Sequence, residues 1–293
     1  MKLPLRISAL YIALTGVVQA LPFGDPSDFE DRGVDWEVAK VASPPRALID
    51  HLAGKTVKRK VLKRTVIIDK PGVYDFKNVV HVARFSGACD QREGRPASLH
   101  IRSGGVTVRN WICVGTGHDG IHIHSGGGQG WKSRKTLEKV RLTNCWQQAC
   151  EDALTVGFRT RGISLEHCGF LPNPDGDERD KLLQLNHADR LTIHRCYFGP
   201  TKNGIEFKSA ANIRITESTF DHCNTGMRVN TSDKYGGIKP NKPTKVLTRG
   251  CRFIANRRAG ALDGTVVWRS EGDRFERCRN KSERDGGARF DER

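Results

Sequence analysis

The hydrophobic pattern of the chain changes at Thr65. Beyond this residue short runs of β-branched residues recur, such as Val66–Ile68 and 106–108, and Gly, Asn, Asp and Pro separate them. The spacing of three to four residues that buries one face of a helix is lost from here on. Short β-branched runs bounded by turn-forming residues are typical of strands. The pattern therefore predicts an all-β structure.

An eight-residue pattern repeats within this part of the chain. It reads apolar, any, apolar, two polar residues, a small residue or cysteine, any, and an aromatic residue. The repeat length is about 22 residues, with insertions in some units, and repeats of this length indicate a solenoid. The pattern occupies residues 163–170, 191–198, 213–220 and 246–253, and looser copies begin at Val106, Val140 and Trp268.

A second short strand is predicted about 14 residues after the start of each unit. Several short strands in every unit, joined by polar turns, describe an all-β, right-handed parallel β-helix, a single-stranded solenoid. A leucine-rich repeat would need asparagine and leucine positions that this chain lacks, and a β-sandwich has no reason to repeat at this period. The second strands occupy residues 120–123, 153–156, 182–185, 204–207 and 226–229.

Polar residues occupy equivalent positions along these second strands. In each second strand, outward side chains alternate with inward ones. A further polar residue lies two positions before the first inward residue of the strand. Stacked units are about 4.8 Å apart, so equivalent residues form columns along the solenoid. The first column holds Asp119, Asp152, Lys181, Asn203 and Thr225; the second holds His122, Thr155, Gln184, Glu206 and Arg228; the third holds His124, Gly157, Asn186, Lys208 and Asn230.

Three carboxylates gather at one end of the first column. Asp119 and Asp152 are neighbours there, and Glu151 directly precedes Asp152. Crowded carboxylates repel, and a hard cation with flexible oxygen coordination, such as Ca²⁺, relieves the repulsion. Lys181 lies one unit further, where nearby positive charge would disfavour its charged form and make it available as a base. A solvated ladder of salt bridges would use the same residues, and the spacing favours neither interpretation.

The formal net charge of +16 indicates a polyanionic partner. The basic C-terminal stretch has few of the aromatic residues that interleave with cations in nucleic-acid-binding proteins, so we expect an acidic polysaccharide and no nucleic acid. Gln184, Asn186 and Arg228 would bind sugar hydroxyls and carboxylates.

The N-terminus has the features of a secretory signal peptide. Residues 1–20 combine early positive charges, a short apolar run and a small-residue cleavage site, which predicts a secreted, extracellular protein. No later stretch is apolar enough for a membrane helix, and we expect no membrane partner and a monomer. We divide the remaining chain into an N-terminal segment or cap (21–64) with a short helix at Arg46–Leu52, the β-helix (65–280) and a basic tail (281–293).

Nine cysteines in a secreted chain suggest some disulfide bonds and at least one free thiol. Cysteines in the small position of the repeat are expected to form an inward stack of buried free thiols, because free cysteine packs as a small hydrophobic residue. Cysteines outside that position are the better disulfide candidates. The first group is Cys145, Cys168, Cys196 and Cys251, and the second is Cys89, Cys113 and Cys150.

The chain resembles the pectate lyases of polysaccharide lyase family 3, which are secreted parallel β-helix enzymes. The resemblance covers roughly half of the chain, and the order of the motifs is its specific part. The motifs are C-D-Q-R-E-G at 89–94, G-V-T-V-R-N at 105–110, D-G-I-H at 119–122, C-E-D-A at 150–153 and D-K-L-L-Q-L-N at 180–186.

The resemblance implies a role for individual residues. Asp119, Glu151 and Asp152 match the calcium ligands of the family and Lys181 its essential lysine, whereas Lys208 falls where the family usually has an arginine. Glu93, in the first motif, joins the substrate-binding residues. The implied reaction is calcium-dependent cleavage of polygalacturonate, the de-esterified form of pectin, by β-elimination to unsaturated oligogalacturonides.

Two other functions stay open from the residues. A β-helix hydrolase of the polygalacturonase type would need a pair of carboxylates about the scissile bond, and Glu151 with Asp152 could supply it, but Lys181 would then have no role. A secreted protein that binds acidic glycans without cleaving them would need neither a base nor a proton donor.

Overall fold

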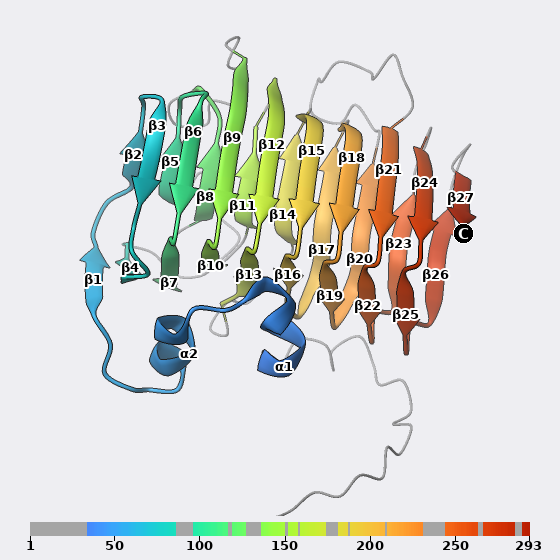
Figure 1. Cartoon of the computed structure of the whole chain (residues 1–293), viewed down its shortest axis with the longest axis horizontal. Coiled ribbons are helices and arrows are strands. Elements are labelled where there is room, and N and C mark those ends of the chain that lie inside the picture. Colours follow the sequence, from blue (N-terminus) through green and yellow to red (C-terminus); the bar gives the residue numbers. More distant parts are fainter. Residues whose placement is uncertain are drawn as a thin grey trace, which may run out of the picture.

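The computed structural model describes residues 34–85, 96–116, 119–126, 136–149, 152–157, 159–173, 181–186, 188–208, 210–230, 244–262, 266–284 and 289–293. In these residues three parallel sheets of nine strands each run along one solenoid (Figure 1). Every third strand in chain order belongs to the same sheet, so each turn of the chain adds one strand to each sheet. This confirms the predicted all-β, right-handed parallel β-helix.

The three sheets are called A, B and C. Sheet A contains β1 (Arg59–Leu62), β4 (Val80–Arg84), β7 (Ile112–Thr116), β10 (Trp146–Ala149), β13 (Gly169–Pro172), β16 (Tyr197–Phe198), β19 (Thr219–Asp221), β22 (Arg252–Ile254) and β25 (Arg274–Glu276). Sheet B contains β2 (Val66–Ile68), β5 (Ala97–Ile101), β8 (Asp119–Ile123), β11 (Asp152–Val156), β14 (Lys181–Asn186), β17 (Thr201–Lys208), β20 (Cys223–Asn230), β23 (Arg258–Leu262) and β26 (Asn280–Arg284). Sheet C contains β3 (Gly72–Asp75), β6 (Val106–Arg109), β9 (Leu137–Thr143), β12 (Thr160–Glu166), β15 (Ala188–His194), β18 (Ala211–Thr216), β21 (Thr244–Arg249), β24 (Val266–Glu271) and β27 (Arg289–Glu292).

The aromatic position of the repeat forms a stack inside the solenoid. Neighbouring rings lie nearly parallel, and their centroids are 5.5, 4.9, 4.8 and 5.2 Å apart along the stack. Offset stacking of this kind adds to the free energy gained by burying the rings. The register of sheet A is thereby tied to the sequence repeat. The stacked residues are Phe170, Phe198, Phe220, Phe253 and Phe275.

An asparagine ladder closes one corner of the early coils. Asn78, Asn110 and Asn144 all have positive φ angles, of 54°, 57° and 52°. The side-chain amide of Asn144 donates to Oδ1 of Asn110 at 2.7 Å and to Oδ1 of Asn78 at 3.2 Å. Asparagine tolerates the left-handed region better than most residues, so these side chains both permit the turn and connect the coils.

The cysteine prediction is confirmed for the stack and wrong for one disulfide candidate. The seven cysteines that the structure describes are free, and Cys145, Cys168, Cys196 and Cys251 are buried as expected. Cys113 is also a free, buried thiol, because it occupies an inward position of β7, and burial raises its pKa to about 12. The other two candidates, Cys89 and Cys150, lie outside the described residues.

The outer face of sheet A is covered by the N-terminal helices α1 (Trp36–Ala39), η2 (Lys40–Ala42) and α2 (Arg46–Leu52), of which α2 was predicted. The side chain of Asp35 caps α1 by accepting from the backbone amides of Glu37 and Val38. Figure 1 shows the helices against the strands of sheet A. Among the described helices, none is long and apolar enough to cross a membrane.

Trp146 is the centre of the contact between the helices and sheet A. Its ring lies 6.1 Å from that of Trp36 and 6.4 Å from that of Tyr197. The ring covers Gly169, where a Cβ atom would approach Trp146 to 2.2 Å, so only glycine fits. Leu48 of α2 joins the same buried cluster. The helices therefore bury an apolar face that the solenoid would otherwise expose.

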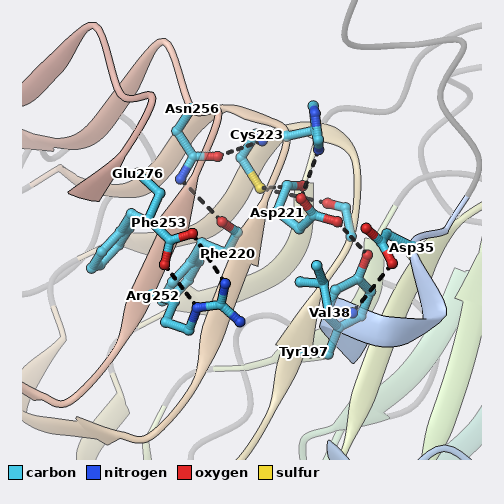
Figure 2. A network of polar contacts seen from close by, with 12 residues as sticks. Asp35, Val38, Tyr197, Phe220, Asp221, Cys223, Arg252, Phe253, Asn256 and Glu276 are labelled. Atoms are coloured by element: carbon cyan, nitrogen blue, oxygen red, sulfur yellow. Dashed lines mark hydrogen bonds and ion pairs between the residues drawn. The ribbon is translucent and has the colours of Figure 1, made fainter. Parts of the chain in front are cut away.

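A buried polar network lies beside α1. The hydroxyl of Tyr197 donates to Oδ2 of Asp221 at 2.9 Å, and Nδ1 of His222 lies 2.6 Å from Oδ1 of the same carboxylate. Figure 2 shows Asp35, the cap of α1, close to Tyr197. Burial and the charge of Asp221 raise the pKa of Tyr197, which stays protonated and donates.

The solenoid extends beyond the boundaries placed from sequence. β1 lies in the expected N-terminal segment, and β26 and β27 include most of the described residues of the expected basic tail. β1 is an edge strand whose outer residues are exposed, and cationic side chains at a sheet edge discourage pairing with another chain. In β27, Phe290 packs 4.6 Å from Trp268. Positive charge obscured the strand pattern in both stretches.

Candidate functional site

The three predicted columns lie on the outer face of sheet B. Asp152 pairs in register with Lys181, Lys181 with Asn203, and Asn203 with Thr225. Asp119 is the neighbour of Asp152, because the residues two positions further along their strands are paired. The second column is in register along all five rungs, and the third is in register from Asn186 through Lys208 to Asn230. The sequence repeat thus placed these side chains in the correct order.

A row of mostly small residues follows the first column and allows the rungs to approach closely. A Cβ atom on Gly120 would lie 1.9 Å from the carbonyl oxygen of Ala153, and one on Gly204 would lie 2.6 Å from that of Gly226. Glycine is the residue that permits such a close backbone approach. The first and second columns then lie on the same face, as the contact between Asp152 and Thr155 demonstrates.

Asp152 and Lys181 form a buried ion pair. Nζ of Lys181 lies 3.4 Å from Oδ1 of Asp152, and the two side chains are only 6% and 7% exposed. The hydroxyl of Thr155 donates to the other carboxylate oxygen at 3.1 Å. A buried charge left without its partner is costly, so this pair differs from an exposed salt bridge of small energetic value. The structure holds a lysine amine and a carboxylate together at the centre of the face.

Asp119 adjoins a cluster of imidazoles. Its Oδ2 atom lies 3.3 Å from Nε2 of His122, whose ring is 6.0 Å from that of His100 and 5.5 Å from that of His124. Burial, helped by repulsion from Arg102 and His122, lowers the pKa of His100 to about 4. Burial and the other imidazoles lower the pKa of His124 to about 3. These two rings are therefore neutral at ordinary pH.

Both nitrogens of His100 already have partners. Nε2 lies 3.1 Å from the carbonyl oxygen of His124, and Nδ1 accepts from Nε of Arg102 at 3.2 Å. This pattern fixes the neutral tautomer that carries its proton on Nε2. His100 is thus a structural support for the neighbouring imidazoles.

A second polar group lies further along the same strands. Nζ of Lys208 donates to Oε1 of Gln184 at 3.0 Å and lies 3.7 Å from Oε2 of Glu206. Gln184, Glu206 and Asn186 are all buried, although they are polar. Lys208 pairs in register with Asn186, which is five residues beyond Lys181. The backbone of Lys208 is therefore about 16 Å along the strand direction from the first column.

Two carboxylates on adjacent rungs provide the hard oxygen donors that Ca²⁺ prefers. Asp119 and Asp152 are such a pair, and both belong to the expected ligand set. The third expected ligand, Glu151, lies outside the described residues, as does Glu93. In the described part of the chain no group of three or more His, Cys, Asp or Glu side chains is arranged to hold a metal ion. The donor chemistry of the two aspartates fits calcium.

Several residues of this face were not predicted from the sequence. His100 lies one rung before His122 in the second column, and Arg258 lies one rung after Thr225 in the first. Extending each column by one repeat would have found both. Glu206 was placed in the second column but given no role, and only the side-chain contact with Lys208 brings it into the site.

A comparison of the chain with protein-family models finds no match, and neither does a comparison with curated proteins. The function must therefore be inferred from the geometry of this face and from the motifs that the sequence carries.

Proposed function

We propose that the protein is a secreted, calcium-dependent pectate lyase that cleaves polygalacturonate by β-elimination. The observation that carries the proposal is the first column, where Asp119, Asp152 and Lys181 lie on three consecutive rungs with the lysine paired to the second aspartate. Carboxylates for a hard cation and an amine for proton abstraction are then on one face. The order of the sequence motifs supports the same reaction.

Asp119 and Asp152, with Glu151, would hold the calcium ion. When bound, Ca²⁺ supplies charge neutralisation to the uronate carboxylate, which acidifies the proton at C5. The Asp152 carboxylate attracts the ammonium form of Lys181, so a base role requires that this negative charge be compensated.

Lys181 is the proposed general base. In its neutral form the amine takes the C5 proton of a galacturonate residue. The electron pair of the broken C5–H bond forms the C4–C5 double bond, and the C4–O glycosidic bond breaks. The departing oxygen keeps that bonding pair and receives a proton from solvent. No water attacks the sugar, so the product is an unsaturated oligogalacturonide.

The other polar side chains of the face bind and orient the chain of sugars. Lys208, held by Gln184, adds positive charge for uronate carboxylates of the sugar chain. Its backbone lies about 16 Å from the first column along the strand direction, which is too far for its amine to stabilise the enolate-like charge that develops beside Lys181. Asn186 and Arg228 offer donors to hydroxyls and carboxylates in the rows that flank this group. The formal net charge of +16 supports a polyanionic substrate.

Incubation with polygalacturonate tests the proposal directly. We expect an ultraviolet-absorbing unsaturated product in the presence of Ca²⁺ and none after chelation, while the strand signal in circular dichroism persists. The apolar core of the solenoid does not include the carboxylates of the site, so the ion is needed for turnover and not for folding. Loss of the strand signal on chelation would show that the metal is structural and that the assignment is wrong.

A hydrolase of the polygalacturonase type is the second candidate, and Glu206 is the observation that favours it. This buried carboxylate lies on the face that a polyuronate would occupy. It could act as an acid or base in hydrolysis together with a second carboxylate, whereas the lyase mechanism gives it no role. The incubation described above separates the candidates. New reducing ends without unsaturated product indicate hydrolysis, and binding without either product indicates a glycan-binding protein.

A further inference from the structure

A pair of basic residues, Lys63 and Arg64, lies in the bend that joins β1 to β2 at one end of the solenoid (Figure 1). Both residues are exposed, and neither belongs to a strand. No step of the proposed reaction uses them. Exposed loop tips are the preferred places at which proteases cut a folded chain, so this pair is a candidate for limited proteolysis.

The other described pairs of adjacent basic residues that end in arginine are tied into strands. Arg59 is the first residue of β1 and pairs in register with Val80. Arg258 is the first residue of β23 and pairs in register with Thr225, whose hydroxyl accepts from its Nε atom at 2.9 Å. Cleavage within a paired strand requires local unfolding, which costs free energy. The bend therefore holds the pair that needs the least unfolding. The two other pairs are Lys58–Arg59 and Arg257–Arg258.

The bend separates two parts of the molecule that are buried in different clusters. The chain over residues 34–62 forms the helices on sheet A and the edge strand β1. Buried residues of the helices, such as Leu48, belong to the cluster around Trp146, and of this stretch only Leu62 belongs to the core of the solenoid. All residues of the candidate site follow the bend. Cleavage after Arg64 therefore leaves the site and nearly all of the solenoid core intact.

Contacts with sheet A hold the N-terminal part in place independently of the peptide bond. β1 pairs with β4 over its whole length, from Arg59 to Leu62. The ring of Trp36 lies 6.1 Å from that of Trp146, and Leu48 is fully buried. The free energy gained by burying apolar surface does not depend on which chain carries it. We therefore expect the two parts to remain associated after cleavage.

We propose that the peptide bond between Arg64 and Thr65 is a processing site for an endoprotease that recognises pairs of basic residues, and that the processed protein has two chains, with the N-terminal chain still on sheet A. An acidic pocket of such a protease complements two adjacent cations. Hydrolysis breaks the C–N bond and consumes one water, whose hydroxyl goes to the carbonyl carbon of Arg64 and whose proton goes to the nitrogen of Thr65. The inference rests on the proposed function only for secretion, because a precursor segment of this kind is removed in the secretory pathway.

Limited digestion of the folded chain tests the site. The probe is a subtilisin-like endoprotease specific for Lys-Arg, and intact mass spectrometry identifies the products. We expect the first cut after Arg64, and Arg64→Gln should slow it roughly a hundredfold or more, because the pocket of the protease loses its charged partner. Arg59→Gln is the matched control, since it removes the same charge from a neighbouring pair, and it should change the rate by less than about twofold. A first cut after Arg59 or Arg258, or a folded chain that resists the protease, would overturn the site.

Size-exclusion chromatography of the cut protein tests the two-chain state. We expect both chains to elute together in native buffer and separately in guanidinium chloride, and separation in native buffer would overturn this state. Expression of the full chain in a secreting eukaryotic host tests processing itself. Sequencing should find Thr65 as a second N-terminus of the secreted protein. A secreted protein with the bond intact, or a chain that is not secreted, would overturn processing.

The lyase proposal and the processing site fail separately. If the folded chain is cut after Arg64 but forms no unsaturated product from polygalacturonate, the lyase proposal fails and the processing site stands. If unsaturated product forms and the bond after Arg64 resists the protease, the reverse holds.

Discussion

Sheet A and sheet B are built from the same repeat but present outer faces of different chemistry. On sheet A the outward residues Val80, Ile112 and Trp146 are apolar and are covered by the N-terminal helices. On sheet B the outward residues of the central rungs are polar or charged, and Asp152 and Lys181 are buried nonetheless. The two faces share register and rung spacing, so the difference lies in the side chains.

The contrast separates residues that stabilise the fold from residues that serve a site. Burying apolar surface under α1 and α2 stabilises the fold by about 25 cal/mol per Å². Packing alone therefore accounts for the apolar residues on the outer face of sheet A. Burying carboxylates and amines costs free energy unless each group finds a partner. On sheet B the buried polar groups have such partners, Asp152 with Lys181 and Lys208 with Gln184. These pairs bury no additional apolar surface that would stabilise the fold. Such costly groups collected in one place are typical of functional sites.

Lys181→Ala should have the largest effect. Loss of a general base lowers the rate of unsaturated product formation roughly a hundred- to ten-thousand-fold. Because Asp152 loses a buried partner, the free energy of unfolding should also fall, by about 3 kcal/mol or more without Ca²⁺. Product absorbance and urea unfolding measure the two effects. Lys245→Ala, an exposed lysine on sheet C, is the control, and a near wild-type rate in Lys181→Ala would eliminate the mechanism.

Trp146→Ala tests whether the outer face of sheet A serves stability and not the reaction. The change removes a fully buried indole between Trp36 and Tyr197 and should lower the free energy of unfolding by about 3 to 5 kcal/mol. Where the variant remains folded, its rate with polygalacturonate should stay within about threefold of the parent. A hundred-fold loss of rate in the folded variant would mean that the two faces are not separate.

Tyr197→Phe should lower the free energy of unfolding by less than Trp146→Ala does, with no effect on the reaction rate. The change leaves Oδ2 of the buried Asp221 without the hydroxyl that donates to it. Loss of a hydrogen bond to a charged group costs about 1.5 to 3 kcal/mol. Thermal unfolding of the variant measures it, and an unchanged midpoint would show that water replaces the hydroxyl.

The imidazole cluster should make stability depend on pH. The pKa values of His100, about 4, and of His124, about 3, lie below the ordinary value of 6.5. The unfolded chain therefore binds more protons between these values, and the free energy of unfolding falls as the pH decreases from 6.5 towards 4. One pKa unit corresponds to about 1.4 kcal/mol, and residual contact of the two rings with solvent reduces the loss below that full value. His100→Gln should flatten this slope in urea titrations at several pH values, and an unchanged slope would refute the assignment.

The sequence alone determined the fold and the order of the site residues. A repeat of about 22 residues requires equivalent positions to stack, and the strand period of two decides which of them face outward. The columns of Asp152, Lys181 and Gln184 followed from these two periods. The stack of inward cysteines followed for the same reason, because one repeat position has one environment.

The tertiary structure decided the contacts between polar side chains, which the sequence repeat does not predict. The position of Lys208 beside Gln184 and Glu206 depends on side-chain conformations, and the burial of the Asp152–Lys181 pair depends on how the surrounding structure packs. Cys113 was misjudged because it lies within a strand of sheet A, in register with Gln147, two positions beyond the slot of the cysteine repeat, which directly precedes the strands of that sheet. The strands at both ends were hidden because positive charge masked their alternation. A repeat fixes which backbones are neighbours, whereas contacts between long polar side chains depend on the space that all neighbouring coils leave.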